Sequence, residues 1–305
     1  MFARMEATSV TPTQADHPDF DQAIAVDGHD GTYTAVVHPA WDGPLSTHGG
    51  LLGAIILGAI DREVNLDQSM QIRSLTCQYL RPPAHGTVEV SVEVLRRGRR
   101  FASSRATMAH DGKVCITALA THSVRDLPSV DQWSPRAPKA EPSPDRNAPM
   151  RTPQEMLAGG GGWLKMPAGT PEFFSRLLFA PRFGSGPFVG PPVDPDVGTT
   201  NGGWLMTREP RSIDVSYLAF LVDVFWPSVL EPLRTPAIAP TLDLTTHFRA
   251  ILPPEGLPDQ PLLVHNTSIA VENGLADSDS RVFSAEGRLL AQGRQMQMLA
   301  PFGES

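Results

Sequence analysis

The segment from His48 to Ile60 constrains the fold more than any other part of the chain. It reads His-Gly-Gly-Leu-Leu-Gly-Ala-Ile-Ile-Leu-Gly-Ala-Ile, without a carboxylate, lysine or arginine on any side of a helix. A helix that is apolar nearly all round is buried and not laid on a surface. Its longest apolar stretch, Leu51 to Ile60, is too short to span a bilayer, which takes about 20 residues. Other elements must therefore wrap around this helix.

Strand patterns surround the predicted helix and can supply that wrapping. Residues 87–95 alternate valine with polar side chains, which is the clearest strand signal in the chain. Asp111-Gly112 lies between two further strand-like runs and is typical of a type I′ hairpin turn. The other predicted strands of this half are 32–38, 70–80, 101–110 and 113–123. An antiparallel sheet wrapped around one buried helix is the economical arrangement.

The same order of elements recurs in the second half of the chain. A buried helix is predicted from Tyr217 to about Leu230, and Glu286-Gly287 matches the turn at Asp111-Gly112. Phe248-Arg249 followed by a proline pair echoes Leu80-Arg81, which also precedes two prolines. The predicted strands are 203–208, 241–250, 262–271, 281–285 and 288–299. Two unrelated α+β domains are the alternative, but the coincident turn and strand ends favour a duplicated unit.

A proline-rich region separates the two units. Fourteen of the 30 prolines lie between residues 124 and 195, so most of this region should be an irregular connection. Within it, residues 172–183 are apolar enough to form the first strand of the second unit. We therefore predict an N-terminal unit at 1–123, a connection at 124–170 and a C-terminal unit at 171–305.

Composition excludes several classes of function. The formal charge is −8, and the short basic run Arg96–Arg100 is too small to make a nucleic-acid surface. Cysteine and histidine do not occur at metal-ligand spacing, so no metal is expected. The two cysteines, Cys77 and Cys115, are expected to be free core thiols of a reducing compartment. The first residues lead into polar sequence without an apolar stretch, so we expect a cytoplasmic protein without a membrane partner.

Asp223 is the residue that most strongly suggests a functional site. It lies in Leu218–Trp226, a run with no other polar side chain. Burying a polar group without partners costs about 2–7 kcal/mol, so a carboxylate here needs compensation. A buried acid of this kind is a candidate active-site group. The alternative is an aspartate that reaches solvent from the edge of a helix.

These features together resemble the double-hotdog acyl-CoA thioesterases, the TesB-like group. The first half carries Trp41-x-Gly-Pro-x-x-x-His-Gly-Gly50 and Leu95-Arg-x-Gly-Arg99, and the second carries Gly203-Trp204, an Asp in a Leu-rich segment before Pro227, and a C-terminal Gln. The resemblance covers the chain apart from the proline-rich connection. It implies an α+β fold, a tandem hotdog, in which two antiparallel sheets each wrap a central helix and join edge to edge.

The resemblance also implies a set of three catalytic side chains in the second half. The family's helix Asp falls on Asp223, its strand Thr on Thr241 and its last-strand Gln on Gln295, for which Gln292 and Gln297 compete. The first half has no equivalent set. Alignment of the two hairpin turns places Ala120 opposite Gln295, and the first helix lacks an acid before Asp61. The C-terminal half would then supply the catalytic residues, and the N-terminal half would form a wall of the acyl pocket.

Thioester hydrolysis is the reaction that these residue types permit. Asp223 would act as general base on a water, which typically contributes about 10²–10⁴-fold, while Thr241 and Gln295 orient that water. His48, Gly49 and Gly50 could polarise the carbonyl through backbone N–H groups at a helix start; packing of small residues is the alternative. Arg97 and Arg99 could meet coenzyme A phosphates. No separate cofactor is expected, because coenzyme A is part of the substrate.

Other readings of the same residues stay open. Asp243 is a rival carboxylate on one strand face with His247, and a solvated face explains both. The chain lacks a Gly-x-Ser-x-Gly elbow, so a covalent serine mechanism has no support. A non-catalytic acyl-CoA or acyl-carrier binding protein is the main alternative function, and an enoyl-CoA hydratase or dehydratase is a weaker one. A homodimer is one way to cover the sheet edges.

Overall fold

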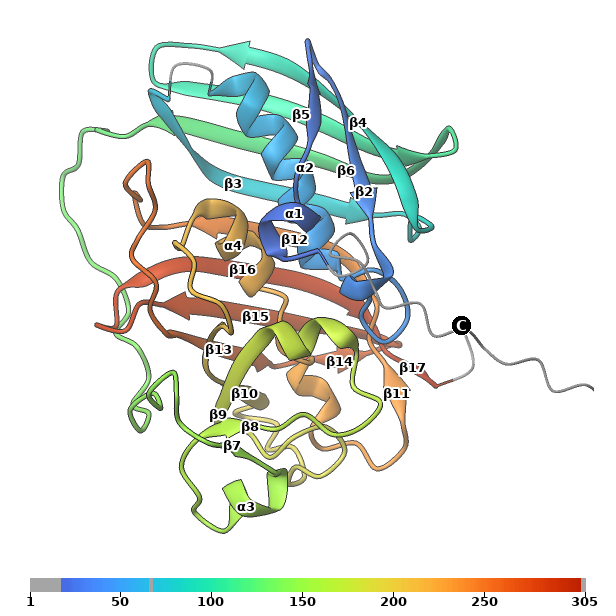
Figure 1. Ribbon diagram of the computed structural model, residues 1–305, viewed down its shortest axis with the longest axis vertical. Coiled ribbons are helices and arrows are strands. Elements are labelled where there is room, and N and C mark those ends of the chain that lie inside the picture. The colour runs from blue at the N-terminus through green and yellow to red at the C-terminus, as the bar shows by residue number, and fades with distance from the viewer. Residues whose placement is uncertain (1–17, 66–67, 303–305) are drawn as a thin grey trace, which may run out of the picture.

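The computed structural model describes residues 18–65 and 68–302 (Figure 1). The expectation about the first residues of the chain therefore lies outside the described part. In Figure 1 the N-terminal unit lies above the C-terminal unit, and each half places a helix against its sheet.

The first half is a sheet of antiparallel strands around helix α2 (Gly49–Val64), as predicted. The helix is buried along most of its length because its apolar side chains point in all directions. Asp111 and Gly112 both have positive φ values, 48° and 70°, which is the backbone geometry of the expected hairpin turn. The strands are β1 (Asp27–His29), β2 (Thr32–Val37), β3 (Met70–Tyr79), β4 (Gly86–Arg97), β5 (Phe101–His110) and β6 (Lys113–Val124).

The second half repeats this topology. The order of strands in the first sheet is β2-β4-β5-β6-β3, and in the second it is β10-β13-β15-β16-β12, with β9 added at the outer edge. The strands are β9 (Leu177–Phe183), β10 (Thr199–Thr207), β12 (Thr241–Phe248), β13 (Leu262–Ser268), β15 (Leu275–Phe283) and β16 (Leu289–Met298). The matched order confirms the predicted tandem hotdog and the equivalence of the two turns.

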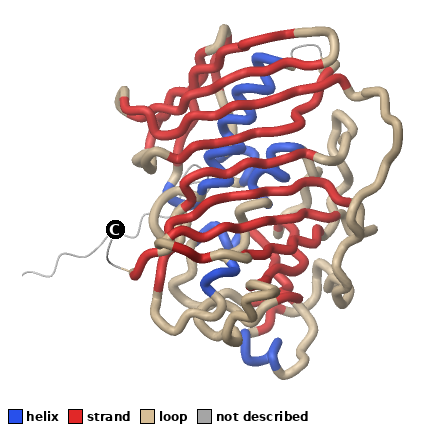
Figure 2. Tube along the Cα trace, turned by 180° about the vertical axis from the view of Figure 1, so that it is seen from behind, coloured by secondary structure: helices blue, strands red, loops and turns tan. Residues whose placement is uncertain are grey.

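The two sheets join into one. Strand β3 of the first half pairs with β12 of the second in antiparallel register, from Asp243 opposite Gln78 to His247 opposite Ser74. The result is a continuous 13-stranded sheet, whose strands are stacked one above another when the molecule is seen from behind (Figure 2). Helices α2 and α4 (Val215–Leu221) lie on the same side of this sheet and pack against each other.

Several predicted elements of the second half are wrong in extent. The strands expected at 203–208 and 281–285 begin earlier, at Thr199 and Leu275. The helix expected from Tyr217 to Leu230 ends at Leu221, and its continuation is a turn followed by the 3₁₀ helix η4 (Ser228–Leu230). The strand expected at 172–183 begins only at Leu177, because Glu172–Arg176 forms the 3₁₀ helix η3. Pro171 precedes that helix and sets a backbone angle compatible with its start.

The connection between the units is mostly irregular. Residues 125–149, all of them described, contain no helix or strand, whereas residues 150–164 hold three short elements. The division at 123 and 170 stays a prediction. The remaining short elements of the chain are α1 (Phe20–Ala23), η2 (Pro39–Trp41), β7 (Met150–Arg151), α3 (Pro153–Leu157), β8 (Trp163–Leu164), β11 (Ala237–Ile238), β14 (Val271–Glu272) and β17 (Ala300–Pro301).

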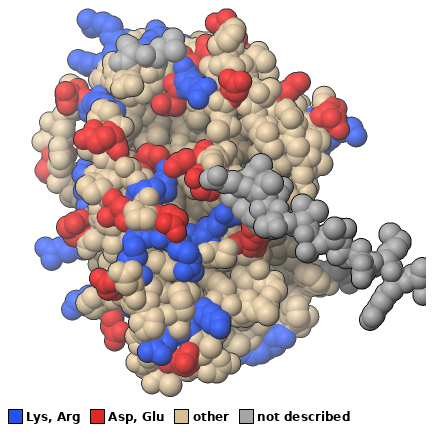
Figure 3. All heavy atoms as spheres, in the orientation of Figure 1, with Lys and Arg blue, Asp and Glu red and all other residues tan. Residues whose placement is uncertain are grey.

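Among the described residues, the face of the molecule shown in Figure 3 has no large region of a single charge. Acidic and basic side chains are interspersed over the face shown in Figure 3. In the part of the chain that the structure describes, no helix has the length and apolar character needed to cross a membrane.

Candidate active site

Asp223 lies just beyond the end of α4 and not inside it. Its N–H donates to the carbonyl of Phe220 at 3.2 Å, as in a tight turn that closes the helix. Pro227 prevents a helix from running on to Leu230, since a proline ring clashes with the carbonyl four residues earlier, here that of Asp223, but α4 already ends at Leu221. The carboxylate is thereby turned away from the helix and toward the start of α2.

The N-terminus of α2 compensates the charge of Asp223. Gly50, the second residue of that helix, donates its N–H to Asp223 Oδ2 at 2.8 Å. Because the first N–H groups of a helix have no partner within it and carry its positive dipole end, they stabilise a carboxylate. The Asp223 side chain is 13% exposed. The acid thus belongs to the second half and its counter-dipole to the first.

Glycine is required at position 50 by the approach of the two halves. A Cβ there would lie 2.8 Å from the Phe220 carbonyl oxygen and 3.1 Å from Asp223 Cβ. The packing explanation of the His-Gly-Gly motif is therefore correct for Gly50. Its N–H is also occupied by Asp223, which leaves Gly49 as the glycine whose N–H could polarise a carbonyl, since the first helical residue has no acceptor within its helix.

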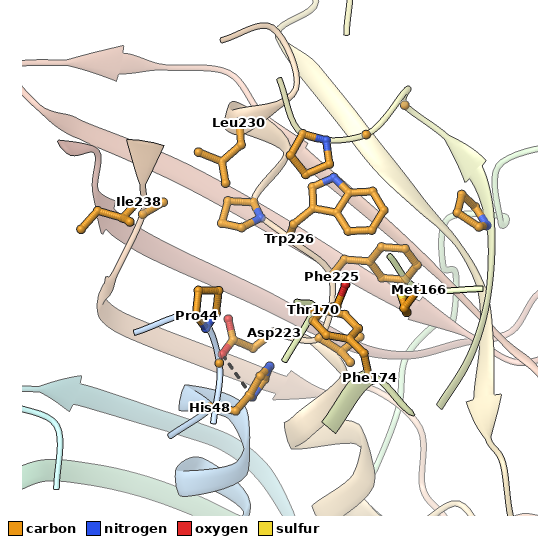
Figure 4. A pocket seen from close by; sticks show the side chains of 18 of the residues that line it. Pro44, His48, Met166, Thr170, Phe174, Asp223, Phe225, Trp226, Leu230 and Ile238 are labelled. Atoms are coloured by element: carbon orange, nitrogen blue, oxygen red, sulfur yellow. Dashed lines mark ion pairs between the residues drawn. The ribbon is translucent and has the colours of Figure 1, made fainter. Parts of the chain in front are cut away.

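His48 is a neighbour of Asp223 that the sequence did not place there. Its Nδ1 lies 3.8 Å from Asp223 Oδ2, and its ring is wedged between Phe173 and Phe220, each 4.9 Å away between centroids. Burial lowers the pKa of His48, against the opposing pull of Asp223, so the imidazole is neutral near pH 7. Figure 4 shows His48 and Asp223 directed toward each other from the two halves.

Tyr79 and Cys77 lie beside this pair on β3. The Tyr79 hydroxyl donates to the Gly49 carbonyl at 2.9 Å and so fixes the start of α2. Burial raises the pKa of Tyr79 well above its ordinary value, with Cys77 and Asp223 adding to the shift, so it stays a protonated donor. Burial also raises the pKa of the Cys77 thiol to about 12, which makes a thiolate nucleophile there unfavourable.

Thr241 and Gln295 are brought together by strands β12 and β16. The Thr241 hydroxyl donates to Gln295 Oε1 at 2.7 Å. Gln297 lies opposite Thr241 in the strand register, lines the same cavity as Thr241, and is 2% exposed with no hydrogen-bond partner for its Oε1 in the described residues. Gln295 itself does not line the cavity, so Gln297 is the stronger rival for its predicted role, whereas Gln292 accepts a hydrogen bond from Arg249.

A cavity of about 1440 Å³ opens beside Asp223, His48 and Thr241. Its wall is formed by both halves and by the proline-rich connection, and it is rich in aromatic side chains (Figure 4). Sites for small molecules are concave and mostly apolar with a few polar groups, and their usual volume is about 300–1,000 Å³. This cavity is larger than that. The apolar side chains that line it include Leu52, Met156, Met166, Phe173, Phe174, Phe188, Phe225, Trp226, Leu230 and Ile238.

Models of one protein family match both halves of the chain. The acyl-CoA thioesterase N-terminal domain matches residues 37–123, and the acyl-CoA thioesterase C-terminal domain matches residues 144–299. The chain belongs to the acyl-CoA thioesterase family. A search of curated proteins finds no match to it.

Solved structures share the fold of this thioesterase-family chain. A conserved hot dog protein of unknown function from Alicyclobacillus acidocaldarius is 24% identical with a TM-score of 0.73, covering 92% of this chain and 97% of its own. A putative thioesterase II from Thermobifida fusca is 22% identical with a TM-score of 0.70, covering 93% and 98%. An acyl-CoA thioesterase II from Mycobacterium marinum is 17% identical with a TM-score of 0.68, covering 94% and 100%.

The loop that follows β9 in this thioesterase-family chain is anchored by a buried acid. Glu231 accepts N–H groups of Ser185 and Gly186 at 2.6 and 2.8 Å, and the indole N–H of Trp226 at 2.8 Å. Three donors compensate the buried charge. Since Trp226 and this loop both line the cavity, Glu231 holds part of the cavity wall in place. The sequence signal for this role is a lone Glu in an apolar stretch.

Arg97 and Arg99 are not brought to the cavity. Arg97 donates to the Val64 carbonyl at the far end of α2, which is about 22 Å from Gly49 at 1.5 Å per residue. Arg99 lies in the same exposed hairpin, and neither residue lines the cavity. The basic residues at the cavity are instead Arg81, Lys139 and Arg182. Phosphate contacts predicted for Arg97 and Arg99 therefore have no support within one chain.

Asp243 and His247 do not line the cavity either. A register irregularity between Thr241 and Asp243 separates these residues, so Thr241 faces the cavity while Asp243 does not. His247 is exposed. Within residues 18–65 and 68–302, no group of three or more His, Cys, Asp or Glu side chains could hold a metal ion.

Proposed function

We propose that this protein hydrolyses acyl-CoA to a free acid and coenzyme A. Asp223 is the general base that takes a proton from the attacking water, and Thr241 with Gln295 orients that water. The observation that carries the proposal is the carboxylate of Asp223, held at the start of α2 by Gly50 at the edge of a large apolar cavity. Membership of the acyl-CoA thioesterase family supports the substrate class.

Several groups that line the cavity support this proposal. A water beside Asp223 would stand between a carboxylate and the hydroxyl side of Thr241, both of which line the cavity. The N–H of Gly49, at the positive end of α2, can stabilise negative charge on the thioester oxygen. The apolar wall accepts the acyl chain, and Arg81 and Lys139 lie at the cavity where coenzyme A phosphates can be met.

The test is thiol release from a panel of acyl-CoAs of graded chain length. Asp223→Asn should keep the fold and lose about 10²–10⁴-fold in kcat, because the base is gone while the shape is retained. Asp243→Asn is the matched control, since that carboxylate does not line the cavity. Unchanged hydrolysis in Asp223→Asn would exclude it as the base. Tight binding of acyl-CoA by the unaltered protein without thiol release would favour the non-catalytic binding protein.

One observation favours the alternative that the protein is an enoyl-CoA hydratase. The sequence disfavours a hydratase because no His lies near Asp223 along the chain, yet the structure brings His48 Nδ1 within 3.8 Å of that carboxylate. A hydratase would consume the conjugated double bond of an enoyl-CoA without releasing thiol. Incubation with an enoyl-CoA, followed by absorbance of the conjugated thioester and by thiol titration, separates the two reactions.

A further inference from the structure

His48 has two ring nitrogens in different surroundings. Nδ1 is buried, has no hydrogen-bond partner among the described residues, and lies 3.8 Å from Asp223 Oδ2. The ring lines the cavity, and Figure 4 shows it beside Asp223. The imidazole therefore lies at the cavity wall, next to the proposed base.

Packing against two phenylalanine rings helps to fix the position of the His48 ring. His48 is 7% exposed and makes edge contacts with Phe173 and a tilted contact with Phe220. A distance of 3.8 Å is longer than a hydrogen bond, which ends near 3.2 Å, so a shift of less than about 1 Å would join the two groups. A buried nitrogen without a hydrogen-bond partner lowers the stability of the folded protein. A role in the reaction would explain why a histidine occupies this position.

We propose that His48 carries a proton from Asp223 to the sulfur of the leaving thiol. This inference rests on the proposed function. The water oxygen bonds to the thioester carbon while Asp223 takes the proton of the water. The carbon–sulfur bond then breaks, and its electron pair goes to sulfur.

The proton balance closes through the imidazole. The neutral ring donates its Nε2 proton to the sulfur, and Nδ1 receives the proton that Asp223 had taken. Asp223 is again a carboxylate, and His48 is again neutral but carries its proton on Nδ1. Exchange with solvent through the cavity restores the starting tautomer. No other reactant is consumed.

The proposal predicts a dependence on the leaving group. An alkyl thiol such as coenzyme A resembles cysteine, whose pKa is about 8.5, so protonation assists its departure near neutral pH. A nitro-substituted aryl thiol has a much lower pKa and leaves readily as the thiolate. Loss of His48 should therefore impair hydrolysis of the alkyl thioester and spare the aryl thioester with the same acyl group.

The experiment compares His48→Gln with the unaltered protein on both substrates. We expect kcat to fall about 10²-fold or more with acyl-CoA and less than 10-fold with the aryl thioester. His247→Gln is the matched control, because that histidine is exposed and does not line the cavity. Equal losses on the two substrates, or no loss on either, would overturn the proton transfer.

A second measurement needs no variant at His48 and covers the case in which His48→Gln does not fold. Thioesters with one acyl group and thiols of graded pKa are hydrolysed by the unaltered protein. Proton donation predicts a kcat that varies little with thiol pKa, and a steep dependence would refute it. Failure of the proposed function is distinct, because the unaltered protein would then release no thiol, or Asp223→Asn would keep its activity.

Discussion

Gly50→Ala tests whether the contact between the two halves positions the proposed base. The added methyl group would meet the Phe220 carbonyl oxygen at 2.8 Å, Asp223 Cβ at 3.1 Å and His48 Cε1 at 3.2 Å. The Phe220 oxygen belongs to the backbone of α4 and cannot turn aside. The variant must therefore push the start of α2 away from the turn that carries Asp223.

The expected cost follows from overpacking. Extra methyl groups in a packed interior cost about 1–3 kcal/mol. Gly58→Ala in the same helix is the control, because the nearest atom to its new Cβ is at 3.8 Å. Alanine in a helix interior is favoured over glycine by about 0.8–1.0 kcal/mol. The free energies of unfolding of the two variants should thus differ by about 2–4 kcal/mol, with Gly58→Ala the more stable.

Denaturant unfolding gives the stability and thiol release from acyl-CoA gives the activity. Gly50→Ala should also lose about 10²-fold in kcat, since a misplacement near 1 Å has an effect of that size. Gly58→Ala should keep the unaltered rate. The reasoning is refuted if Gly50→Ala is as stable and as active as Gly58→Ala, because the close approach would then be unimportant for the site.

Three further predictions follow from the site. Glu231→Gln should destabilise the loop that it anchors by about 1–3 kcal/mol, seen as faster proteolysis there and a raised KM; an unchanged cleavage rate would contradict the anchor. Since burial lowers the pKa of His48 below the ordinary 6.5, the unfolded chain binds a proton first as the pH falls through that value. The free energy of unfolding should then fall more between pH 7.5 and 5.5 in the unaltered protein than in His48→Gln, and equal falls would exclude the effect. Arg97→Ala with Arg99→Ala should leave the KM for acyl-CoA unchanged, whereas Arg81→Ala should raise it several-fold at low salt; the reverse result would move the phosphate site to the hairpin.

The fold was predictable because its signals are local and repeated. Alternating valines in β4 and the Asp111-Gly112 turn each specify their own geometry, and β16 takes the same place in the strand order of its half as β6 does in the first. The end of α4 was less accessible, because the apolar run through Trp226 suits a longer helix. Pro227 is a signal against a helix that reaches Leu230, because its ring would clash with the carbonyl of Asp223, but no local pattern places the end at Leu221.

The candidate site was predictable only in part. The sequence predicts Asp223, Thr241 and Gln295 as site residues, and the structure joins the last two by a hydrogen bond. The approach of His48 to Asp223 depends on how the two halves pack, 175 residues apart in the chain, and no local pattern encodes that. The proline-rich connection is a second example. Its composition predicts an irregular backbone, but it does not predict that the connection forms part of the cavity wall.

The pairing of β3 with β12 limits how a substrate can enter. A ladder of main-chain hydrogen bonds runs from Gln78 to Ser74 across the middle of the sheet, so the halves cannot open like a hinged shell without breaking it. Admission and release must then depend on movements of the cavity rim, formed in part by the proline-rich connection. Exchange of that connection between relatives would accordingly change which acyl groups enter, with the reacting groups beneath left untouched.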